Sequence, residues 1–125
     1  MKEYKTFKDL SVWASARKLC VEVYSLTQTF PSIEQFGLTN QLRRASVSVA
    51  SNIAEGYGRQ YKKETIQFLY TSKASINEVE AQLLIATDLK FIKEEDLKTV
   101  FQTIEETRKQ IIGYIKYLSA ASELR

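Results

Sequence analysis

The sequence predicts an all-α fold, an up-down-up-down antiparallel four-helix bundle that forms a single domain over residues 1–125. Apolar residues recur at steps of three and four, the period of the α-helix, in four stretches of the chain. One proline and four glycines leave little punctuation for many short strands. A chain of 125 residues can bury about two-thirds of its unfolded surface. Short connections between the helices favour antiparallel neighbours.

The first helix is expected at residues 9–30. Asp9 can cap its N-terminus, and Pro31 ends it because proline cannot continue a helix. Cys20 falls on the apolar side, so we interpret it as a small core residue rather than a reactive thiol. The inward row of this helix is Leu10, Trp13, Ala16, Cys20, Val23, Tyr24, Thr27 and Phe30.

The second helix is expected at residues 39–56, with Thr39 or Asn40 as its N-cap. Gly56 and Gly58 follow its last turn, where glycine accepts the left-handed backbone common just past a helix. Its inward row is Leu42, Ala45, Val49 and Ile53.

Two further faces of this helix separate at about 100° per residue. The face opposite the core carries Arg44, Ser48, Ser51 and Glu55. A flank between the two carries Arg43, Val47, Ala50 and Ala54. Alanines bury with little loss of side-chain entropy and let backbones come close. The flank therefore fits tightly against a helix of the same chain or, alternatively, forms an oligomer interface through Val47, Ala50 and Ala54.

The third and fourth helices are expected at residues 61–89 and 94–121. The acidic run 94–96 suits the first turn of the fourth helix, because negative charge is stabilised at a helix N-terminus. The inward row of the third helix is Tyr61, Ile66, Leu69, Ile76, Val79, Leu83 and Ala86. That of the fourth is Leu97, Val100, Phe101, Ile104, Ile111, Ile115 and Leu118.

The chain has no histidine and one cysteine, which excludes several classes of site. Neither a Ser-His nor a Cys-His nucleophile pair is possible, and a structural zinc site lacks its ligands. We therefore expect no catalytic residue, no metal, no cofactor and no enzymatic activity. The N-terminus has no apolar core of the kind a signal peptide needs, and no apolar stretch is long enough to span a bilayer. The expected location is the cytoplasm, with no membrane partner.

The net charge of +3 is unevenly distributed. Residues 1–63 hold ten Lys and Arg against five Asp and Glu, a balance of +5. Residues 64–125 hold eight against ten, a balance of −2. Basic side chains neutralise phosphates, and aromatic rings stack on unpaired bases. The candidate nucleic-acid-binding residues are Arg43, Arg44, Arg59, Lys62 and Lys63, interleaved with Tyr57 and Tyr61, and in second rank Arg17 and Lys18.

Each of these residues also has an ordinary structural interpretation. Either Arg43, which lies beside the apolar flank, or Arg44 is expected to pair with Glu78 or Glu80 of the third helix. Arg44, Arg59, Lys62 and Lys63 are equally compatible with a solvated surface. Glu55 can form a local network with Arg59, and Glu80 is expected to have an arginine partner rather than a metal. The GYGR turn is not a phosphate-binding loop, because no strand precedes it and Tyr61 stands where the third glycine would be.

Four segments of the chain resemble one protein family: FKDLSVWASARKL, LTQTFP, FGLTNQLRRASVSVASNIAEGYGR and NEVEAQL. It is the four-helix-bundle family encoded in intervening sequences of bacterial 23S ribosomal RNA genes, and the resemblance covers roughly residues 7–120. It implies a bundle that assembles into a ring, as a homopentamer. A similar protein, the accessory subunit of diversity-generating retroelements, binds nucleic acid and a reverse transcriptase through basic surfaces.

Two positions depart from the family pattern. Ala50 stands where members often have proline, so the middle of the second helix is expected to be straighter. Lys90 stands where members often have glycine, which removes the easiest cap for the third helix.

The sequence and the resemblance together predict a non-enzymatic nucleic-acid-binding protein that acts as an oligomeric ring and binds structured RNA rather than DNA. The alternative is an oligomeric adaptor that binds a protein partner. In that case the alanine flank and exposed tyrosines such as Tyr114 and Tyr117 would matter more than the arginines.

Overall fold

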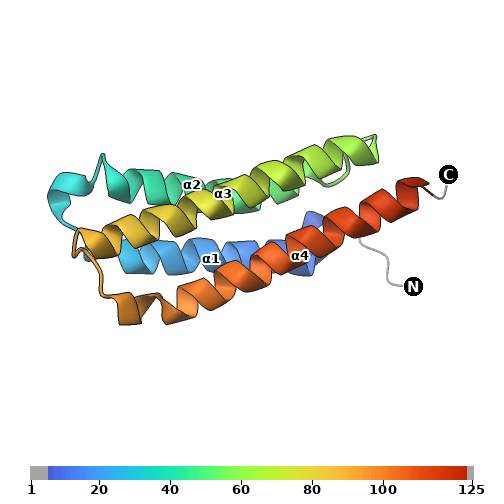
Figure 1. Ribbon diagram of the computed structural model, residues 1–125. Helices are drawn as coiled ribbons and strands as arrows, with labels where there is room; N and C mark the ends of the chain where they lie inside the picture. Colours follow the sequence, from blue (N-terminus) through green and yellow to red (C-terminus); the bar gives the residue numbers. More distant parts are fainter. Residues whose placement is uncertain (1–5, 124–125) are drawn as a thin grey trace.

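A computed structural model describes the backbone of residues 6–123 and the side chains of residues 6–120. Over this range the chain forms an all-α four-helix bundle without strands, as predicted (Figure 1). Its α-helices are α1 (Ser11–Thr27), α2 (Leu38–Gly56), α3 (Lys62–Asp88) and α4 (Lys98–Glu123). Three short 3-10 helices are η1 (Phe7–Asp9), η2 (Ser32–Glu34) and η3 (Glu94–Leu97).

Consecutive helices run in opposite directions, and α4 closes the bundle by packing against both α1 and α3. The connection from α1 to α2 and that from α3 to α4 therefore lie at one end of the bundle (Figure 1). The short turn between α2 and α3 lies at the opposite end. This arrangement places Arg43 and Arg44, in the first half of α2, away from Arg59, Lys62 and Lys63, which follow its C-terminal end.

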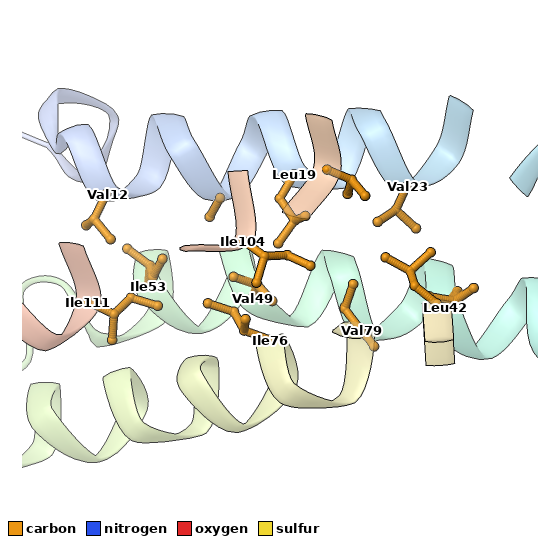
Figure 2. Packing of buried hydrophobic residues seen from close by; sticks show 14 of the residues in the cluster. Val12, Leu19, Val23, Leu42, Val49, Ile53, Ile76, Val79, Ile104 and Ile111 are labelled. Carbon is orange, nitrogen blue, oxygen red and sulfur yellow. The ribbon is translucent and has the colours of Figure 1, made fainter. Parts of the chain in front are cut away.

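All four helices contribute to one continuous core (Figure 2). Labelled side chains such as Leu19, Val49, Ile76 and Ile104 point from different helices into the same interior. The predicted inward rows of α2 and α4 are correct, although Phe101 is only half-buried.

The rows of α1 and α3 need correction. Tyr24 is exposed on α1, whereas Val12 and Leu19 are buried there in its place. Tyr61 precedes α3 and is 57% exposed, since its backbone is extended rather than helical.

The starts of the first two helices differ from the predicted ones. Asp9 lies in η1, where its carboxylate accepts the backbone N–H of Thr6 at 3.2 Å, so it does not cap α1. Neither Thr39 nor Asn40 caps α2, which begins at Leu38. The Leu38 N–H instead donates to Oε1 of Glu34 at 3.0 Å, and a carboxylate there suits the positive end of the helix.

Lys90 ends α3 in the manner of a glycine. Its φ of +64° places it in the left-handed region, which costs about 1–2 kcal/mol for a residue with a Cβ. Its N–H donates to the Thr87 carbonyl at 3.0 Å, and the Phe91 N–H donates to the Ala86 carbonyl at 2.9 Å. These two hydrogen bonds form a Schellman ending. Lys90 therefore adopts the helix ending for which glycine is the usual residue.

No helix within the described part of the chain is both long and apolar enough to cross a membrane.

Candidate nucleic-acid interface

Arg59 lies in the turn between α2 and α3, where Glu55 and Phe68 hold its guanidinium. Its Nη2 lies 3.2 Å from Oε1 of Glu55, and its Nε donates to the Glu55 carbonyl at 3.1 Å. The guanidinium also lies 4.6 Å from the centre of the Phe68 ring. The predicted local network between Glu55 and Arg59 is confirmed. Arg59 keeps 39% of its side chain exposed.

Lys62 and Lys63 occupy the first turn of α3, at the same end of the bundle as Arg59. Lys63 is exposed and Lys62 is half-buried. The exposed ring of Tyr61 directly precedes them, and Tyr57 is half-buried. This end of the bundle thus presents flexible cations beside an accessible aromatic ring, the combination that suits a phosphate next to an unpaired base.

Arg43 is held by α1, and not by α3 as predicted. Its Nε donates to Oγ1 of Thr27 at 2.9 Å, and its guanidinium lies 4.7 Å from the centre of the Tyr24 ring. The predicted pairing of Arg43 with Glu78 or Glu80 is wrong, because Arg43 faces the C-terminal turn of α1. Arg44, the alternative, forms no ion pair with either carboxylate among the described residues.

Arg44 points to the other side of α2, one residue further along the helix. It is exposed and lines a polar hollow of about 380 Å³ between α2 and α3. The other residues of this hollow are Asn40, Gln41, Ala45, Ser48 and Glu78. The two adjacent arginines therefore differ in both direction and role. Arg43 connects α2 to α1, whereas Arg44 is accessible to solvent.

The two second-rank residues lie on α1. Arg17 has its guanidinium 5.4 Å from the centre of the Trp13 ring, and Lys18 is exposed. Arg17 also lines an apolar groove of about 320 Å³ between α1 and α2.

The small-residue flank of α2 forms one wall of this groove. Val47 is 40% exposed, and Ala50 and Ala54 are half-buried. The opposite wall consists of residues of η1 and α1, namely Phe7, Trp13, Arg17, Cys20 and Val21. The flank is thus partly open rather than tightly covered by its own chain.

The tight approach lies on the other side of α2, against α3. A Cβ added to Gly56 would meet Cβ of Phe68 at 2.7 Å. The Ser72 hydroxyl donates to the Val49 carbonyl at 2.7 Å, and the hydroxyls of Ser48 and Ser75 lie 2.9 Å apart. Small residues of α2 therefore do allow close helix packing, but with serines and glycine rather than with alanines.

The expected arginine partner of Glu80 is Arg108 of α4. The Nη2 of Arg108 lies 2.6 Å from Oε1 of Glu80, and it also donates to Oδ1 of Asn77 at 3.0 Å. Arg108 pairs in addition with Glu105 of its own helix. Among the described residues, no group of three or more His, Cys, Asp or Glu side chains could hold a metal ion.

A second basic surface, on the outer face of α4, was missed by the sequence reasoning. A shallow hollow of about 1020 Å³ runs along this helix, and Lys98, Lys109 and Lys116 line it. Their spacings of 11 and 7 residues place them on one face of a helix. The signal was present in the sequence, but the net negative charge of residues 64–125 concealed it.

Comparison with known proteins places this architecture in a family. The model of the 23S rRNA-intervening sequence protein family matches residues 8–113. The fold is similar to the crystal structure of a protein of unknown function from the S23 ribosomal protein family of Bacteroides thetaiotaomicron VPI-5482. The two share 22% sequence identity and a TM-score of 0.76, over 84% of this chain and 95% of the other. No curated protein matches the sequence. The chain belongs to the 23S rRNA-intervening sequence protein family.

Proposed function

We propose that this protein is a non-enzymatic, cytoplasmic RNA-binding protein that contacts structured RNA with the end of the bundle where α2 turns into α3. The observation that carries the proposal is the exposure of Lys63 and Tyr61 beside the fixed guanidinium of Arg59. Lys62 adds a fourth group in the first turn of α3. We refer to Arg59, Tyr61, Lys62 and Lys63 as the basic end.

The chemistry of the basic end favours nucleic acid over an acidic protein. Lysine ammonium groups neutralise phosphates without demanding one geometry. Arg59 is already paired with Glu55, so the two lysines supply most of the attraction for phosphate at the basic end. The exposed Tyr61 ring offers a surface on which a base can stack, and only unpaired bases are free to do so. RNA with loops or bulges presents both features together.

The same proposal includes assembly into a homo-oligomer, a pentameric ring by resemblance to the family. The partly open groove between α1 and α2 supports it, because Val47, Ala50 and Ala54 leave apolar surface uncovered there. A ring would repeat the basic end around one rim and so enlarge the positive field that attracts RNA.

Fluorescence anisotropy with a labelled RNA hairpin, at low and at near-physiological salt, tests the proposal. The wild-type protein is expected to bind saturably, with affinity that falls as salt rises. The double variant Lys62→Ala/Lys63→Ala should bind at least tenfold more weakly, on the scale set by losing two phosphate contacts. The matched control is Lys109→Ala/Lys116→Ala, which removes the same charge from the outer face of α4.

The two double variants also distinguish the surfaces. Loss of binding only in the α4 control would move the interface to α4, and no binding by the wild-type protein at either salt would overturn the RNA proposal.

A second candidate function, an oligomeric adaptor for a protein partner, is favoured by one observation at the opposite end of the bundle. In the connection from α1 to α2, Ile33 and Phe36 are 86% and 87% exposed. Large apolar side chains so exposed are typical of contact surfaces. Of the tyrosines expected to serve an adaptor, Tyr117 is 67% exposed and Tyr114 is half-buried. The adaptor hypothesis predicts that Ile33→Ser/Phe36→Ser abolishes partner capture while RNA affinity stays unmeasurable.

A further inference from the structure

The polar hollow between α2 and α3 carries donors and acceptors on facing walls. Arg44, Gln41 and Ser48 come from α2, at steps of three and four that keep them on one face. Glu78 comes from α3. The hollow has a volume of about 380 Å³, and its lining includes the exposed side chains of Gln41, Arg44 and Glu78, so a flat heterocycle placed there would be only partly covered.

The two charged residues of the hollow, Arg44 and Glu78, do not form an ion pair with each other. Arg44 and Glu78 are both exposed. Among the described residues, neither has an oppositely charged side chain with nitrogen and oxygen within 4.0 Å of each other. Because these opposite charges lie on facing helices and are not paired, both can bind one ligand placed between them. A phosphate would not suit this hollow, because the Glu78 carboxylate would repel it.

A buried amide sets the position of the Glu78 carboxylate. Gln82, one turn further along α3, is only 9% exposed. Its Nε2 donates to Oε2 of Glu78 at 3.3 Å and to Oε1 of Gln41 at 3.5 Å, so it orients two residues of the hollow. Its own Oε1 is buried, and none of the described residues donates a hydrogen bond to it. Leaving a buried acceptor unsatisfied costs about 1–3 kcal/mol.

We propose that this hollow binds an unpaired guanine base of the RNA. Guanine presents two adjacent donors, N1–H and the 2-amino group, and a carboxylate such as that of Glu78 can accept both. Its O6 and N7 are acceptors, and arginine donates to this pair in bidentate fashion. The buried methyl of Ala45 provides an apolar floor. Adenine has no donor at either position that faces the carboxylate, so it would give Glu78 no hydrogen bond.

This inference rests on the proposed RNA binding and adds base selectivity to it. Arg44 lies about three turns of helix before the end of α2 at Gly56, where the basic end begins, so a single-stranded segment would have to run along α2 between the two sites. The basic end then supplies affinity and the hollow supplies sequence preference, the usual division between phosphate and base contacts.

Competition between hairpins that differ at one loop position tests the inference. The loop consists of uridines apart from one guanosine, one inosine, which lacks the 2-amino group, or one adenosine. The wild-type protein should bind the guanosine loop about tenfold more tightly than the adenosine loop, with inosine between them. Glu78→Gln should reduce the guanosine preference to less than about twofold, because its amide can accept only one of the two donors.

Matched variants show whether a change in the ratio of guanosine-loop to adenosine-loop affinity is specific to Glu78. Glu106→Gln removes the same charge from the outer face of α4 and should shift all three affinities equally, leaving the ratio unchanged. Lys63→Ala should weaken binding to all three loops and also leave the ratio unchanged. Thermal unfolding of Glu78→Gln should match that of the wild type, because Glu78 is exposed.

The outcomes separate the two proposals. Binding of all three hairpins with equal affinity would overturn the guanine site while leaving RNA binding intact. A preference that survives Glu78→Gln would also overturn it. Absence of binding to every hairpin would overturn the RNA function and the guanine site together.

Discussion

The two long sides of α2 differ in how the neighbouring helix meets them. On the α3 side the backbones are close, and hydroxyl groups bridge them, as between Ser72 and the Val49 carbonyl. On the α1 side Arg43 contacts Thr27 at one end, the buried Ser46 hydroxyl lies 3.7 Å from Cys20 Sγ, and a partly open apolar groove lies beside them. One side of the helix is therefore committed to the fold, whereas the other retains surface that a second molecule can cover.

The difference shows that small residues on a helix can serve either close packing within the chain or an open surface. Gly56 and the serines of α3 are small because another backbone occupies the space. Ala50 and Ala54 are small although the space beside them is a groove. Tight packing within a chain and preparation for an external contact thus use similar residue types on opposite sides of one helix.

The largest effect on stability is expected at Gly56. Gly56→Ala places a Cβ 2.7 Å from Cβ of Phe68, so the helices must move apart. Overpacking of this kind costs about 1–3 kcal/mol of unfolding free energy. Urea denaturation measures it. Gly113→Ala is the control, since nothing lies within 4 Å of the added Cβ, and it should stabilise the protein by about 0.5–1 kcal/mol. Equal stability of Gly56→Ala and the wild type would show that the α3 side is not tightly packed.

A smaller effect is expected from the contact on the α1 side. Arg43→Ala removes the hydrogen bond to Thr27 and the stacking on Tyr24, which together should lower the unfolding free energy by about 1–2 kcal/mol. Arg44→Ala, one residue along, should change it by less than about 0.5 kcal/mol, because Arg44 is exposed. Equal losses from the two variants in urea denaturation would contradict the distinction between the twin arginines.

The smallest effect on folding is expected inside the groove. Val47→Asp should change the unfolding free energy of the monomer by less than about 0.5 kcal/mol, since Val47 is 40% exposed. If the groove is covered by another copy, the new charge would be desolvated there and would disfavour assembly. Sedimentation velocity should then show a smaller species than for the wild type. An unchanged sedimentation coefficient of an oligomeric protein would remove Val47 from the interface.

Much of the fold was predictable because periodicity fixes the direction of a side chain around its helix. The buried rows of α2 and α4 follow from this alone. Helix starts were harder, because Glu34 caps α2 from four residues upstream and no local N-cap motif marks it. The Lys90 ending was also hidden, since the sequence has no glycine there.

The candidate site was predictable in part. Periodicity separated Arg43 from Arg44, and the Glu55–Arg59 network follows from an i, i+4 spacing. The partner of Arg43 did not follow, because the direction of a side chain does not tell which neighbouring helix lies there. The polar hollow could not be predicted from the sequence, since it joins residues of α2 to Glu78 across thirty or more positions of the chain.

The most direct test of the central claim is the salt dependence of RNA affinity, measured as the slope of log K against log salt for the wild type and for Lys62→Ala/Lys63→Ala. Each phosphate contact contributes about 0.7–0.9 to this slope. The account predicts a clearly negative slope for the wild type and one that is shallower by about 1.4–1.8 for the double variant. A wild-type slope near zero, or identical slopes for the two proteins, would contradict RNA binding through the basic end.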